Sequence, residues 1–134
     1  MDVTNRLGRH SLISLSAIAL AILALSSGLA SCKSLDDINK LAVTNIDISK
    51  VHDGSYVAKQ DNKLVMAQVR VDVAGGRITS IAVLAHNHGP GHGAEAIVNR
   101  VMAAQSLEVD AISGATYSSK VMRKAIELAL DQGL

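Results

Sequence analysis

Apolar and polar residues alternate over residues 64–73, LVMAQVRVDV, in the middle of the chain, most regularly from Ala67 to Val73. Such alternation with a period of two predicts a strand with one buried face. The apolar face would hold Val65, Ala67, Val69, Val71 and Val73, and the polar face would hold Gln68, Arg70 and Asp72.

Turn residues divide this region into three strands. Gly75-Gly76 separates the central strand from a second apolar run over residues 77–85, and a Gly-Gly pair is a hairpin signal because both positions tolerate positive φ. A shorter strand over residues 55–60 lies between the turns at Asp53-Gly54 and Asp61-Asn62. We therefore predict three consecutive antiparallel strands.

The second half of the chain has a helical spacing of apolar residues. This spacing predicts helices over residues 94–105 and 118–131, with Ser118 or Ser119 as a candidate cap of the second helix. The resulting fold class is α+β, a small antiparallel sheet packed on one face by two helices.

The N-terminal region has the pattern of an export signal. Arg6, Arg9 and His10 precede the 14-residue apolar stretch 12–25, which small residues follow. This pattern predicts a secretory signal peptide over residues 1–31. The apolar stretch is short for a membrane-spanning helix, which needs about 20 residues. The alternative is a permanent N-terminal membrane anchor.

Cys32 is the chain's single cysteine, so it has no partner for an intramolecular disulfide. The sequence Leu29-Ala30-Ser31-Cys32 resembles the bacterial lipobox, which implies cleavage before Cys32 and lipidation of its thiol. The expected location is the outer side of the cell membrane, with the lipid as anchor. Residues 32–50 would form the lipidated cysteine and a polar tether, and residues 51–134 the domain. Ordinary cleavage near Ala30 with a free Cys32 is the alternative.

Charge argues against a nucleic-acid partner. Removal of residues 1–31 leaves a chain with 11 basic and 11 acidic residues, hence no net charge. A nucleic-acid-binding domain would carry a basic excess.

Two loops contain residues that could carry chemistry. The first, residues 86–93 (HNHGPGHG), holds His86, His88 and His92, and three histidines could bind a metal ion. The other interpretation is a solvated polar loop that leads into a helix. We expect no bound metal, because a glycine-rich loop supplies the fixed geometry of a metal site poorly.

The second loop is the turn Ser113-Gly114-Ala115-Thr116, just before the last helix. Free N–H groups at a helix start attract anions, phosphate above all. Glycine and alanine leave room for a close approach of the ligand, and Thr116 adds a hydroxyl. Taken from its residues alone, the turn fits either a phosphate site or a simple capping turn.

The ten residues 110–119, DAISGATYSS, closely resemble the flavinylation motif of the FMN-binding domain family, which includes the FMN-carrying subunits of sodium-translocating NADH:quinone reductase. The stretches DGSY at 53–56 and GGRITSI at 75–81 are also similar to this family, so the resemblance covers residues 51–134.

The resemblance implies that Thr116 bears FMN through a phosphoester to its hydroxyl. Ser113, Gly114 and Ala115 would shape the backbone around the phosphate, and Asp110 would hold the turn or be recognised by the flavin transferase that installs FMN. Tyr117 replaces the aliphatic residue of many relatives and either stacks on the flavin or packs beside the helix. His86 or His92 would hydrogen-bond the isoalloxazine ring, while Tyr56 would lie in the core or the pocket wall.

The function implied is that of a lipid-anchored electron carrier rather than a complete enzyme. It would take electrons from a membrane donor and pass them to an extracytoplasmic acceptor. The alternatives are a metal- or ligand-binding lipoprotein that uses the histidine loop, and a domain that binds FMN without the covalent bond.

Overall fold

The protein has the predicted α+β fold. The computed structural model describes residues 33, 35–88 and 93–134, of which residues from 35 onward belong to one compact unit. A three-stranded antiparallel sheet contains, in this order, β1 (Gly54–Asp61), β2 (Met66–Ala74) and β3 (Arg77–Asn87). Two helices follow, α2 (Ala96–Ala104) and α3 (Thr116–Asp131). The predicted signal peptide, Cys32 and His92 lie outside the described residues.

The hairpin between β2 and β3 turns at the expected glycines. Gly75 and Gly76 have φ values of 60° and 69°, so both adopt the left-handed conformation that glycine tolerates. Pairing of Val71 with Ile81 and of Val69 with Val83 aligns the apolar positions of β2 and β3 on one face of the sheet. The alternation over residues 64–73 thus gives β2 one apolar face, as the sequence predicts.

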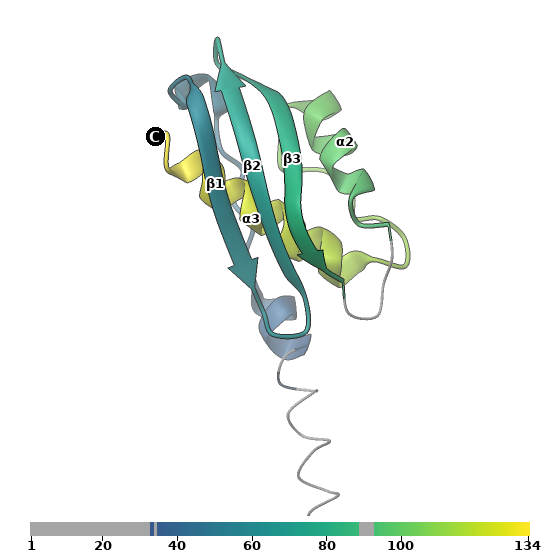
Figure 1. Ribbon diagram of the computed structural model, residues 1–134. Coiled ribbons are helices and arrows are strands. Elements are labelled where there is room, and N and C mark those ends of the chain that lie inside the picture. The colour runs from purple at the N-terminus through teal and green to yellow at the C-terminus, as the bar shows by residue number, and fades with distance from the viewer. Residues whose placement is uncertain (1–32, 34, 89–92) are drawn as a thin grey trace, which may run out of the picture. The chain divides into compact units, whose positions relative to one another are not determined.

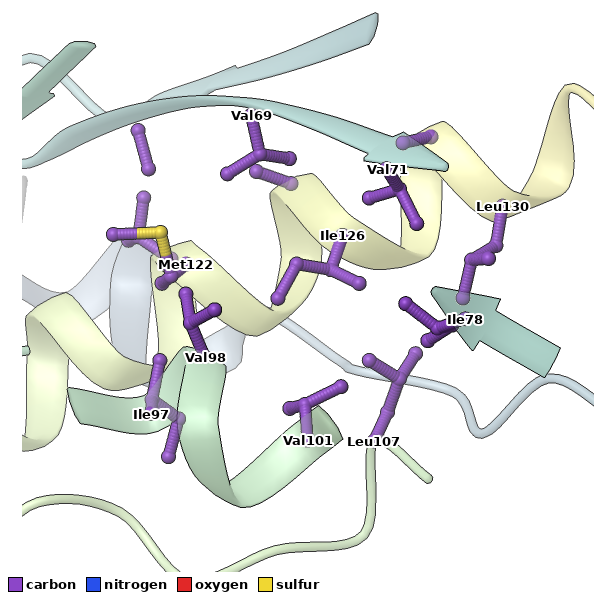
Figure 2. Packing of buried hydrophobic residues seen from close by; sticks show 14 of the residues in the cluster. Val69, Val71, Ile78, Ile97, Val98, Val101, Leu107, Met122, Ile126 and Leu130 are labelled. Atoms are coloured by element: carbon purple, nitrogen blue, oxygen red, sulfur yellow. The ribbon is translucent and has the colours of Figure 1, made fainter. Parts of the chain in front are cut away.

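That face carries the core. Val69 and Val71 of β2 are fully buried, and they face Met122, Ile126 and Leu130 of α3, which are buried as well (Figure 2). Helix α3 runs across the face of the sheet, while α2 flanks β3 (Figure 1). Helix α2 adds its own apolar stripe to the same cluster, namely Ile97, Val98 and Val101 (Figure 2).

A glutamine side chain joins α2 to the outer edge of β3. The Gln105 carboxamide accepts from the Ile78 N–H at 2.8 Å and donates to the Ile78 carbonyl at 3.0 Å, as a neighbouring strand would. Gln105 ends α2 in the left-handed conformation, with φ of 50°. This contact holds α2 at a fixed position beside the sheet.

The segment before β1 packs more closely than a tether would. Residues 35–40 are helical, Ile38 is fully buried, and Ile48 of the short 3₁₀ helix η1 (Ile48–Lys50) is buried in the same core. The Thr44 N–H also donates to the Glu127 carboxylate of α3 at 3.0 Å. The folded unit therefore includes residues that the sequence analysis assigns to a tether, because their few aliphatic side chains are drawn into the core.

Within the described part of the chain, no helix is both long and apolar enough to cross a membrane.

Candidate functional site

The end of β3, the start of α2 and the start of α3 meet at one end of the domain (Figure 1). The Ser118 hydroxyl of α3 donates to the His88 carbonyl, just beyond β3, over 3.1 Å. The His86 side chain of β3 contacts Glu95 at the start of α2. His86 and His88 of the histidine loop thus lie beside the starts of α2 and α3.

Thr116 is the first residue of α3, and it is exposed. The preceding Ala115 is buried, and no side chain of the described residues caps the helix start. The N–H groups of the first turn are therefore available to an anion, and the helix dipole favours negative charge there. A phosphate group bonded to the Thr116 hydroxyl would have room here, and the helix dipole would stabilise its negative charge.

Gly114 gives the turn its shape. Its φ is 77°, in the left-handed region, and a Cβ placed there would meet nothing within 4 Å. Backbone conformation, rather than a crowded neighbour, is what requires glycine here. The space beside the turn is open, so a ligand can approach the backbone next to Thr116.

Ser119 fastens the turn to the helix. Its hydroxyl is fully buried and accepts from the Ile112 N–H at 3.0 Å, while the Ala115 N–H donates to the Ile112 carbonyl at 2.9 Å. The prediction that Ser118 or Ser119 caps the helix is wrong, because the N-cap position is Ala115. The helix begins two residues earlier, so both serines lie inside its first turn and bind neighbouring loops instead.

Two arginines hold the extended segment that leads into the turn. The Arg100 guanidinium donates to the carbonyls of Asp110 and Ala111 at 2.9 and 3.2 Å. Arg123 donates to the carbonyl of Val109 at 3.0 Å. The sequence alone does not predict this role of Arg100, because nothing in it indicates that α2 lies beside residues 110–111.

The Asp110 side chain lies on the surface of the domain. Its side chain is exposed and forms no hydrogen bond or ion pair with any of the described residues. The backbone of Asp110 is fixed through its carbonyl by Arg100, so the turn does not need this carboxylate. Ser113 and Gly114 are exposed too, and together with Thr116 they form one accessible surface.

His86 and Glu95 form a hydrogen-bonded pair. Nδ1 of His86 lies 2.7 Å from the Glu95 carboxylate, and this hydrogen bond lowers the pKa of Glu95 below its usual value. An ionised carboxylate only accepts, so Nδ1 carries the proton. The His86 side chain is 4% exposed, and its Nε2 is buried with no hydrogen-bond partner among the described residues.

The remaining candidate residues divide between the core and the loop. Tyr117 is half-buried and packs against the core cluster. Tyr56 also packs against the core, and its hydroxyl donates to the His52 carbonyl at 2.8 Å. The rings of His86 and His88 lie edge to face, with centroids 5.2 Å apart. Among the described residues, no three His, Cys, Asp or Glu side chains gather in a way that could hold a metal ion.

These features define the class of protein as a small α+β domain that exposes a threonine hydroxyl at the start of a helix. Comparison with known families supplies the ligand. The model of the FMN-binding domain family matches residues 65–131, which is half of the chain, and the chain belongs to this family. Membership indicates a flavoprotein with FMN as its ligand and a role in electron transfer.

One curated protein is similar to this chain, and its name states no function. The chain is 29% identical over 87 residues to an uncharacterized protein of Treponema pallidum (strain Nichols). This match covers 63% of the present chain and 24% of that protein, so the chain spans only about a quarter of the relative's length.

The residues at this end of the domain fit the chemistry of FMN. The uncapped start of α3 suits the phosphate, the open space at Gly114 suits a close approach, and the unpartnered Nε2 of His86 offers a polar contact for a ring. When bound, FMN supplies the redox chemistry, and the protein contributes binding, orientation and electrostatics.

Proposed function

We propose that this protein is an electron-transfer flavoprotein that carries FMN covalently on the Thr116 hydroxyl. The observation that carries the proposal is the position of Thr116, an exposed hydroxyl on the first residue of a 16-residue helix that lacks a side-chain cap. An ester at this oxygen would place the phosphate beside the free N–H groups of the first turn, which stabilise its negative charge.

A flavin transferase would install the group, with FAD as donor and a divalent metal as its cofactor. The Thr116 oxygen attacks the phosphorus of the FMN half of FAD, the pyrophosphate bond breaks, and AMP leaves. The hydroxyl proton passes to a base of the transferase. The exposed surface of Asp110, Ser113, Gly114 and Thr116 is accessible to such an enzyme, and the carboxylate of Asp110 is free to be recognised by it.

The cellular setting of the proposal comes from the N-terminal sequence. Export by residues 1–31 and lipidation of Cys32 would anchor the protein on the outer side of the cell membrane. There it would accept electrons from a membrane donor and pass them to an extracytoplasmic acceptor. The membrane anchor keeps the carrier close to its donor.

The test is flavin incorporation in the presence of a flavin transferase, FAD and Mg²⁺. Wild-type protein and Thr116→Ser should each gain one FMN that survives denaturation, because both retain the hydroxyl. Thr116→Val should gain none, since it keeps the shape of the side chain but lacks the oxygen. Thr79→Val is the matched control, because Thr79 is an exposed threonine near the other end of β3.

Denaturing gel fluorescence and intact mass separate the alternatives. Flavin that stays on the Thr116→Val variant after denaturation would contradict the ester assignment. Flavin that binds the wild type but dissociates on denaturation would show a domain that binds FMN without a covalent bond.

A further inference from the structure

The fold leaves little chain between Cys32 and the folded unit. The sequence predicts a tether up to residue 50, but residues 35–40 are helical and Ile38 is fully buried in the core. Two residues, 33 and 34, therefore separate Cys32 from Leu35 at the start of this helix. An extended chain spans at most about 3.6 Å per residue, so the α-carbons of Cys32 and Leu35 are no more than about 11 Å apart.

The segment that follows runs along α3 in the direction of the helix. Near the beginning of the segment, the Asn39 carbonyl accepts from Nζ of Lys120 at 2.6 Å, and further on the Thr44 N–H donates to the Glu127 carboxylate at 3.0 Å. Going back along the segment therefore leads towards the start of α3. Lys120 is the fourth residue after Thr116, a rise of about 6 Å along the helix axis.

The sheet shows at which end of the domain the chain enters. Residues 35–40 lie beyond the turn between β1 and β2, at the end of the sheet where β3 ends and α3 begins (Figure 1). The turn between β2 and β3 lies at the opposite end. Since β2 has nine residues, about 30 Å separates the two ends. A membrane attached at Cys32 would thus be much closer to Thr116 than to the β2–β3 turn.

We propose that the end of the domain that carries Thr116 faces the lipid surface of the membrane, held there by lipidated Cys32. The inference rests on the proposed function for its anchor. It deepens that function, because it names the membrane surface as the side from which the electron donor reaches the carrier. A donor whose redox centre lies at the membrane surface would meet the Thr116 end first.

Charge does not produce this orientation. The entering segment carries Lys33 and Lys40 together with Asp36 and Asp37, so its basic and acidic side chains balance. Attraction to anionic lipids needs a cluster of basic residues close to the membrane. The short chain is therefore the physical cause, and the orientation should persist in high salt and on neutral lipids.

Energy transfer to the membrane tests the orientation. The full-length lipoprotein is bound to phosphatidylcholine vesicles that contain a lipid labelled with an acceptor dye. A donor dye is attached to Ser113→Cys at the proposed site or, as the matched control, to Thr79→Cys near the β2–β3 turn, and both residues are exposed. Transfer should be several-fold more efficient from position 113 than from position 79, because about 30 Å of sheet separates the two ends.

A longer tether is the second control. An insertion of about 20 Gly and Ser residues between Ser34 and Leu35 adds a flexible chain with a mean span of roughly 25 Å. The domain can then rotate freely above the membrane. The difference in transfer between positions 113 and 79 should therefore largely disappear in this variant.

The outcomes separate the orientation from the flavin chemistry, because the measurement needs no FMN. Equal transfer from the two positions with the natural tether, or greater transfer from position 79, would overturn the orientation. A preference for position 113 that is lost in high salt would overturn the short chain as its cause. Protein without a lipid on Cys32 would overturn the orientation together with the anchor. Preferential transfer from position 113 in a protein that takes up no FMN would support the orientation and contradict the proposed function.

Discussion

Replacement of Ser119 by alanine should destabilise the domain and disturb the turn at Thr116. The substitution removes the oxygen that accepts from the Ile112 N–H at 3.0 Å, inside a side chain that has no exposure to solvent. A buried donor left without a partner costs about 1–3 kcal/mol. Because Ile112 is half-buried and water can reach part of its backbone, we expect about 1–2 kcal/mol, near the lower end of that range.

Urea unfolding measures this loss directly. The midpoint should fall while the slope stays unchanged, because the surface exposed on unfolding is the same. At the melting temperature, each 1 kcal/mol corresponds to about 4–8 °C for a domain of up to 100 residues. Under conditions where the variant is fully folded, transfer of FMN to Thr116 should also slow, since the Ile112–Ala115 turn has lost its anchor.

Ser118→Ala is the matched control, because it changes the neighbouring buried serine in the same helical turn. Its hydroxyl donates to the His88 carbonyl, so the substitution leaves an acceptor rather than an N–H donor without its partner. We expect a smaller loss of stability than for Ser119→Ala. Equal stability of Ser119→Ala and wild type, or a larger loss for Ser118→Ala, would refute the reasoning.

Two further predictions concern pH and the membrane. The hydrogen bond from His86 lowers the pKa of Glu95 from its usual 4.5. This hydrogen bond therefore stabilises the fold above pH 4.5, and its contribution is lost as the pH falls through the lowered pKa. The stability difference between wild type and Glu95→Gln should therefore narrow in urea unfolding as the pH falls below 4.5, and a constant difference would contradict the assignment. Cys32→Ser should abolish labelling by a fatty-acid analogue and move the protein out of the membrane fraction of a bacterial host, whereas a labelled or still membrane-bound variant would contradict lipidation at Cys32.

Local pattern predicted most of the fold. The alternation over residues 64–73 and the Gly75-Gly76 turn place β2 and β3, because period and turn chemistry depend on neighbouring residues alone. The helical spacing identified both helices, although α3 begins at Thr116 rather than Ser118. The motif also directed attention to Thr116, whose exposure at a helix start the structure shows.

Contacts between distant segments could not be predicted in this way. Ile38 and Ile48 lie in a polar segment, and only the assembled core shows that both are buried. Arg100 and Glu95 both lie on the polar side of α2, where a solvated face is the usual interpretation. Their partners, the Asp110 carbonyl and His86, come from other elements of the chain, so their roles depend on how α2 sits beside β3 and the loop.

The central claim is that the Thr116 oxygen is bonded to phosphorus. Peptide mass spectrometry of the protein purified from its own host tests this most directly. We predict that the peptide containing Ser113–Ser119 carries the added mass of FMN, with fragment ions that locate the addition on Thr116. An unmodified peptide from cells with an active flavin transferase, or an addition located on Ser113, would contradict the account.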